Sequence, residues 1–145
     1  MELDALIERY HDALLVLTGG DAEPLKAMWS HEDDVTLSNP WGPTRRGTSD
    51  AVAGMEFAAS NFRDGTPRSE PHERLALFVS DELALLVENE YWRMKVRGAD
   101  EPSDVDLRVT SAFRREDGAW KVIHRHADPI TRPNPAGVIG YQPDS

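Results

Sequence analysis

Residues 113–126 read FRREDGAWKVIHRH and give the clearest structural signal in the chain. The pair Asp117-Gly118 separates two runs that alternate apolar and polar side chains. An Asp-Gly pair accepts the positive φ angles of a two-residue turn, so the stretch predicts a β-hairpin. Its strands are expected over residues 105–115 and 120–128.

A two-residue turn would fix the register of this hairpin. The predicted opposing pairs are Arg115 with Trp120, Phe113 with Val122, Ser111 with His124, Val109 with His126, and Leu107 with Asp128. One face is then apolar with a few embedded polar groups. The other face is polar and is expected to meet solvent or another subunit; it carries Arg108, Thr110, Arg114, Lys121 and Arg125. A three-residue turn with a bulge would change this register.

Two more runs with strand periodicity precede the hairpin, over residues 72–80 and 83–96. Both faces of the first run carry apolar side chains, so we expect a sheet that is covered on both sides. Glu88 and Glu90 interrupt the second run on one face and need basic partners. The candidate partners are Arg93, Arg97 and the basic groups of a second subunit.

The N-terminal half has the periodicity of helices instead. The predicted helices cover residues 2–17, 21–30 and 49–61. A short strand is expected over 35–38, a turn over 39–43 and a loop over 63–71, where proline and glycine recur. No periodicity follows Pro129, so the chain is interpreted as a single domain over 1–130 with an irregular tail over 131–145.

Composition excludes several classes of function. The 145 residues include 16 Lys and Arg against 26 Asp and Glu, a net charge of -10, which disfavours nucleic acid and anionic membranes as partners. The longest apolar run, residues 83–87, is far below the roughly 20 residues of a membrane-spanning helix. There is no cysteine, so thiolate chemistry is excluded. We expect a soluble, cytoplasmic protein whose partner is a small apolar molecule.

His124, His126 and Asp128 alternate along the last predicted strand and would project to one side. A histidine oriented by a carboxylate is suited to general base catalysis near neutral pH. Two imidazoles and a carboxylate are also a possible metal-ligand set, although no complete metal signature is present. The structural alternative is that each side chain only bonds neighbouring groups at the end of the sheet.

Aromatic residues supply the other candidates. Tyr10 lies on the apolar face of the first predicted helix, where its hydroxyl would either bond a ligand oxygen or form the rim of the core. Trp29, Trp41 and Tyr91 would either line a pocket for a flat ligand or fill the space between helices and sheet.

The order of helices and strands resembles the nuclear transport factor 2-like superfamily, in its SnoaL-like and ketosteroid-isomerase-like branch. Residues 33–42 with Arg46-Gly47 are similar to the first strand and turn of the family, and residues 113–126 to its final hairpin. The resemblance covers about residues 2–130. It implies an α+β fold in which a cone-shaped, curved, mixed or antiparallel sheet carries three helices from the N-terminal half on its concave face. It also implies an apolar pocket at the mouth of the cone and a homodimer formed through the sheet.

The resemblance also tests the known isomerase reaction. Tyr10 matches the tyrosine of the isomerase's oxyanion hole. At the position of the isomerase's general-base aspartate, however, this chain has Asn39, and at the position of its protonated aspartate it has Ser111. An amide cannot shuttle the proton that steroid isomerisation requires, so the chain is not expected to be a classical ketosteroid isomerase.

The leading hypothesis is an isomerase, cyclase or dehydratase that acts on an apolar carbonyl compound without a cofactor or metal. His126, oriented by Asp128, would abstract a proton, Tyr10 would donate to the developing enolate, and His124 would be an alternate base. The expected substrate-binding residues are Asn39, Ser111, Trp29, Trp41, Tyr91 and Phe62. The alternatives are a non-catalytic dimeric binding module and a metal-dependent hydrolase or lyase that uses His124, His126 and Asp128.

Overall fold

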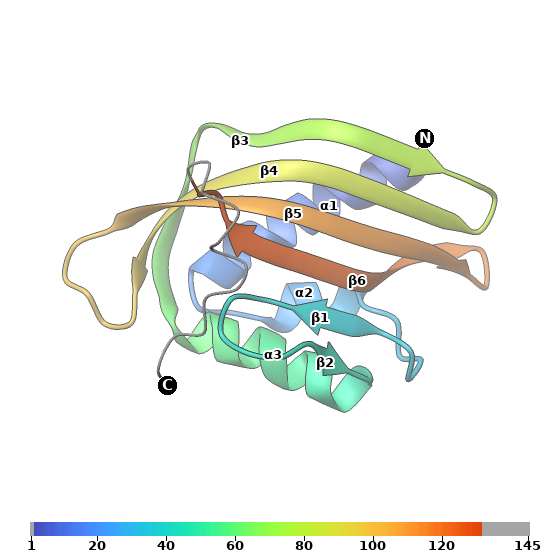
Figure 1. The fold of residues 1–145 in the computed structure, drawn as a ribbon, viewed down its shortest axis with the longest axis horizontal. Coiled ribbons are helices and arrows are strands. Elements are labelled where there is room, and N and C mark those ends of the chain that lie inside the picture. Colours follow the sequence, from blue (N-terminus) through green and yellow to red (C-terminus); the bar gives the residue numbers. More distant parts are fainter. Residues whose placement is uncertain (1, 132–145) are drawn as a thin grey trace, which may run out of the picture.

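The computed structural model describes residues 2–131 (Figure 1). In chain order its elements are α1 (Glu2–Thr18), α2 (Glu23–Met28), β1 (Thr36–Ser38), β2 (Arg45–Arg46), α3 (Thr48–Ser60), β3 (Phe62–Val79), β4 (Leu83–Val96), β5 (Ser103–Glu116) and β6 (Ala119–Pro129). The predicted α+β class is confirmed. The predicted tail lies, apart from its first residue, outside the described residues.

One six-stranded sheet, with the order β2-β1-β6-β5-β4-β3, organises the fold. β1 runs parallel to β6, and the other neighbours are antiparallel, so the sheet is mixed. Figure 1 shows α1 and α2 behind the long curved strands, with α3 beside β1 and β2. The expected curved sheet with N-terminal helices packed on it is therefore confirmed. No helix within residues 2–131 is long and apolar enough to cross a membrane.

The apolar stripe of α1 explains how this helix packs. Its buried residues recur at helical spacing and face the inner side of the sheet: Leu3, Leu6, Ile7, Tyr10, Ala13, Leu14 and Leu17. Together with residues from the inner faces of β4, β5 and β6 they form one core cluster. The polar positions between them remain at the surface, as an amphipathic helix requires.

The predicted loop over 63–71 was wrong, because β3 continues through it. β3 is an edge strand that pairs, among the described strands, with β4 alone, so Pro67 and Pro71 lose no ladder bond on the open side. The register shifts between Arg63 and Thr66 and again between Pro67 and His72, which accommodates the irregular sequence. The short strand β2 was also missed, because two residues are too few to show a period.

The final hairpin has the predicted turn but only part of the predicted register. Arg115 opposes Trp120 and Phe113 opposes Val122, as expected. Beyond these pairs the register was wrong, because an irregularity between Ala112 and Phe113 leaves Ile123 without an opposing residue.

One unpaired residue exchanges the two faces of β6 from that point onward. His124, His126 and Asp128 now oppose Ala112, Thr110 and Arg108 on the outer face of the sheet. Arg125 and Ala127, by contrast, are only 7% and 6% exposed. The arginine expected on the polar face therefore lies inside the protein.

A group of ion pairs, the Arg114 cluster, links β5 to the segment before β1. It consists of Arg114, Asp34 and Glu116, and the guanidinium of Arg114 donates to both carboxylates at 2.7–3.0 Å. Hydrogen bonding to Arg114 lowers the pKa of Asp34. Burial acts to raise the pKa of Glu116, but the hydrogen bonds from Ser30 and Arg114 outweigh it and the pKa is lowered.

Candidate functional site

A polar network lies in the core between α1 and the inner face of the sheet. Arg125 on β6 donates from two nitrogens to the two carboxylate oxygens of Glu90 on β4, at 2.8 and 2.7 Å. The same guanidinium donates to the hydroxyl oxygen of Tyr10 at 2.9 Å. The Tyr10 hydroxyl shares a 2.6 Å hydrogen bond with Ser111, and Trp92 Nε1 donates to Glu90 at 3.0 Å.

The charges of this network compensate each other. Burial acts to raise the pKa of Glu90, but the positive charge of Arg125 outweighs it and the pKa is lowered. Burial likewise acts to lower the pKa of Arg125, and Glu90 raises it overall. Burial raises the pKa of Tyr10, so its phenol stays protonated. The structure thus holds a bidentate ion pair with a neutral tyrosine beside it.

An apolar cavity of about 220 Å³ adjoins this network. Its lining comes from α1, α2 and α3, from β1 and the turn after it, and from β3, β4, β5 and β6: Leu17, Leu25, Leu37, Ser38, Asn39, Pro40, Trp41, Gly54, Met55, Ala58, Phe62, Val96, Val105, Leu107, Arg125, Ala127 and Pro129. Arg125 is the one ionisable side chain among these described lining residues.

Arg125 therefore belongs both to the network and to the cavity wall. A guanidinium has five N–H donors in a fixed plane. Three of them bond Glu90 and Tyr10. Within the described part of the chain, Nε and one hydrogen of the second terminal nitrogen have no protein acceptor. The described residues therefore leave two of the five donors of Arg125 unused.

Three of the six residues expected to bind substrate line this cavity: Asn39, Trp41 and Phe62. Ser111 and Tyr10 are fully buried and are not among the lining residues; Tyr10 accepts a hydrogen bond from Arg125, and Ser111 bonds Tyr10. Trp29 and Tyr91 are outside the lining, so their predicted placement was wrong. Trp29 is buried in the core, and Tyr91 donates to Glu73 at 2.8 Å on the outer face.

His124, His126 and Asp128 do not reach the cavity, because the bulge turns them to the outer face. His124 shares a 2.8 Å hydrogen bond with Thr36, and burial lowers its pKa. The predicted contact between His126 and Asp128 is present at 2.8 Å, but the His126 side chain is 53% exposed. The structure does not bring these three side chains together with Tyr10, Asn39 and Ser111.

Arg125 and Glu90 are the site residues that the sequence analysis missed. A signal was present, because a glutamate on the inner face of a buried strand needs a cation. Arg93 and Arg97 lie nearer to Glu90 in sequence, but its partner is Arg125, which is 35 residues away. Arg125 lies on the inner face of the sheet because of the bulge at Ile123.

Solved structures share this fold. A nuclear transport factor 2-like superfamily protein from Salmonella enterica superposes with a TM-score of 0.74 at 15% identity, covering 93% of each chain. A ketosteroid isomerase-like protein from Erwinia carotovora atroseptica gives 0.72 at 14% identity, covering 90% of this chain and 95% of that one. A proposed dehydratase of the same family from Streptomyces avermitilis gives 0.70 at 17% identity with the same coverage. At these identities the likeness establishes the fold alone.

The family is assigned from the sequence. None of the curated proteins searched matches it. A family model, described as the SnoaL-like domain, matches residues 3–131, which is most of the chain. The chain therefore belongs to the SnoaL-like family.

Proposed function

We propose that the cavity binds a small, mainly apolar molecule with one oxygen acceptor, and that Arg125 donates a hydrogen bond to this oxygen. The observation that carries the proposal is the guanidinium of Arg125, the one charged group among the described residues of a mainly apolar wall. Sites of this type use apolar surface for affinity and a few placed polar groups for orientation.

The charge balance around Arg125 indicates the chemical class of that oxygen. Glu90 already neutralises the guanidinium through two hydrogen bonds. A ligand carboxylate would add a second negative charge to a buried site that has only one cation, which is unfavourable. A neutral carbonyl oxygen accepts the same hydrogen bonds without that cost, so a ketone, aldehyde or ester is favoured.

The cavity volume limits the size of the ligand. About 220 Å³ is below the roughly 300–1,000 Å³ of typical pockets for drug-sized molecules. Ala58 and Ala127 line the wall, so the space exists partly because these side chains are small. We therefore expect a compact ligand of one or two rings or a short chain.

Catalysis on such a ligand is the second candidate function. A preorganised guanidinium beside a carbonyl oxygen is suited to stabilising a developing oxyanion, as isomerisation or dehydration requires. The described lining residues offer no side chain that accepts a proton near neutral pH, since Asn39 and Ser38 are the other polar ones. Ligand binding is accordingly the primary proposal.

Titration with cyclic ketones of increasing size, each paired with its parent hydrocarbon, tests this function. Binding is followed by calorimetry and by the fluorescence of Trp41, which lines the cavity. We expect saturable binding of the smaller ketones and at least tenfold weaker binding of the hydrocarbons, since one lost hydrogen bond to a charged donor costs about 1.5–3 kcal/mol.

Two variants locate the binding site. Ala58→Leu fills part of the cavity and should weaken ketone binding at least tenfold, whereas Ala112→Leu on the outer face is the matched control and should not. If Ala58→Leu binds the ketones as tightly as the wild type, or if hydrocarbons bind equally well, the proposal is wrong.

A further inference from the structure

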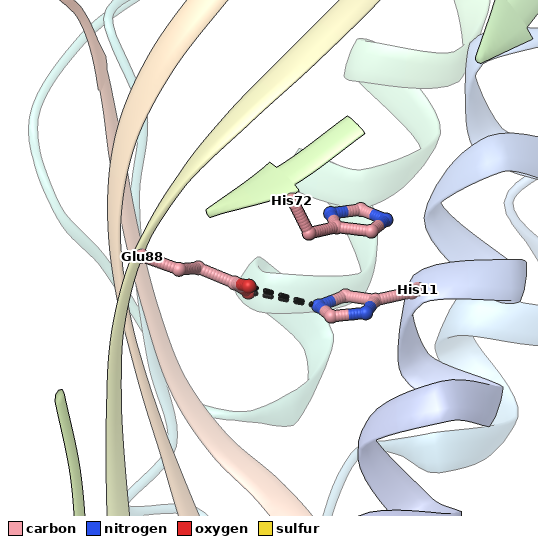
Figure 2. Close-up of side chains that lie close together, drawn as sticks. All are labelled: His11, His72 and Glu88. Atoms are coloured by element: carbon pink, nitrogen blue, oxygen red, sulfur yellow. Dashed lines mark hydrogen bonds and ion pairs between the residues drawn. The ribbon is translucent and has the colours of Figure 1, made fainter. Parts of the chain in front are cut away.

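Two histidines and a glutamate from three different elements meet at the half-buried side of α1 (Figure 2). They are His11 on α1, His72 on β3 and Glu88 on β4. The Nε2 atom of His11 lies 3.0 Å from each carboxylate oxygen of Glu88. The His72 ring stacks on the His11 ring, with 3.5 Å between centroids and 9° between planes.

One nitrogen of this cluster has no partner within the described residues. The Nδ1 atom of His72 is buried and makes no hydrogen bond there. In Figure 2 this nitrogen, next to Cβ, lies over the edge of the His11 ring that faces Glu88. A buried polar atom without a partner costs about 1–3 kcal/mol, so such atoms call for a ligand, an ion or a water molecule.

We propose that His11, His72 and Glu88 form a binding site for a divalent transition-metal ion, with Zn²⁺ as the expected occupant. Two imidazole nitrogens and one carboxylate are a known set of protein ligands for zinc, and they leave a fourth position for water. Imidazole favours zinc and its neighbours over calcium and magnesium, which prefer oxygen ligands.

The distances in the cluster suit this ion after a small adjustment. Two ligand atoms about 2.1 Å from a tetrahedral zinc ion are about 3.4 Å apart. The 3.0 Å separation of His11 and Glu88 is close to that value. All three ligand atoms lie within 4.8 Å of one another, so a rotation of the His72 ring completes the site.

Burial and charge also favour a cation here. Glu88 is 1% exposed, and within residues 2–131 its carboxylate bonds only His11. A metal ion supplies the positive charge that a buried carboxylate needs. The His11 side chain remains 17% exposed, which gives an ion access.

None of the three residues lines the apolar cavity, so this site is separate from the proposed ligand site. It links α1 to β3 and β4. We therefore expect the ion to strengthen the attachment of α1 to the sheet. Binding of the ion can be measured without knowing which molecule occupies the apolar cavity.

The test begins with protein stripped by a chelator and titrated with zinc chloride alone. We expect one zinc ion per chain by calorimetry and a rise in Tm with zinc concentration, because an ion that binds the folded state stabilises it. Cobalt(II) should give the visible absorption of a tetrahedral site. Absence of saturable binding at one ion per chain would overturn the proposal.

Variants assign the ligands. His72→Ala and Glu88→Gln should each weaken zinc binding at least tenfold, whereas His126→Ala is the matched control, since His126 also contacts a carboxylate but on the outer face. Unchanged binding by His72→Ala, or loss of binding by His126→Ala, would refute the assignment. If a ligand variant fails to fold, imidazole NMR signals of the wild type decide: zinc should shift those of His11 and His72 and leave His31, His124 and His126 unchanged.

Discussion

Replacing Arg125 with Met isolates the energetic role of the buried network. Methionine has a similar length but no hydrogen-bond donors, so the change removes the bonds to Glu90 at 2.8 and 2.7 Å and the bond to Tyr10 at 2.9 Å. It leaves the carboxylate of Glu90, which is fully buried, without its cation.

The expected loss is about 3–5 kcal/mol of unfolding free energy, because an unpaired buried charge is left behind. A domain of this size has about 5–15 kcal/mol in total, so the variant should fold but be close to its limit. Among residues 2–131, only Trp92, whose Nε1 donates at 3.0 Å, would still bond the Glu90 carboxylate.

The loss of unfolding free energy in Arg125→Met should also depend on pH. In the wild type Arg125 holds the pKa of Glu90 low against the effect of burial. Without Arg125, burial raises that pKa above its ordinary value, so the carboxyl takes up a proton as the pH falls. The difference in stability between wild type and variant should therefore be larger at about pH 8 than at about pH 5.

Urea unfolding of four proteins measures these quantities: the wild type, Arg125→Met, Glu90→Gln and the double variant. The double variant should be more stable than Arg125→Met, because a neutral amide no longer carries an unpaired charge and still accepts from Trp92. A loss below about 1 kcal/mol for Arg125→Met, or a double variant that shows the sum of the single losses, would refute this account of the network.

Three further outcomes are expected. Gly65→Ala should lower the unfolding free energy measured in urea by about 1–3 kcal/mol, because the new Cβ would lie 2.8 Å from the carbonyl carbon of Thr18 and closer still to the Thr18 side chain. Gly42→Ala, with open space around the new Cβ, should cost little, and equal losses in the two variants would contradict this packing. The two carboxyls of the Arg114 cluster have lowered pKa values, so their contribution is present above the ordinary carboxyl pKa and is lost as the pH falls through the lowered one. The Tm of Arg114→Met should therefore fall less than the Tm of the wild type when the pH is lowered from neutral to about pH 3. An identical fall would show that the cluster does not contribute to stability. The outer face exposes Leu85 (37%) among other apolar side chains, and we propose that this face forms the homodimer that the family resemblance implies. Leu85→Asp should then shift the mass measured by light scattering from dimer to monomer, and a monomeric wild type would exclude that interface.

Local sequence signals were sufficient for most elements of this fold. The apolar spacing in residues 2–17 depends only on neighbours within the same helix, and Asp117-Gly118 defines a turn through its own backbone preferences. The continuous strand β3 could not be recognised in the same way. Proline and glycine over residues 63–71 indicate a loop locally, and only the place of this strand at the sheet edge makes them tolerable.

The candidate site also combines features that the sequence predicts with features that depend on the tertiary structure. The sequence was sufficient for an apolar pocket under a curved sheet and for Asn39, Trp41 and Phe62 in its wall. Which residues of β6 face that pocket was decided by one unpaired residue at Ile123, and strict alternation along the strand cannot reveal it.

By itself, the sequence determined the hairpin, the helices and the family of this protein, because these depend on contacts between residues that are near one another or on a pattern spread over the whole chain. Only the tertiary structure decided the chemistry of its interior. The bulge that turns His126 outward turns Arg125 inward, where Glu90 balances its charge and Glu90 and Tyr10 accept three of its five N–H donors. Such a burial is stable only when all three side chains, from three separate elements, are in place together.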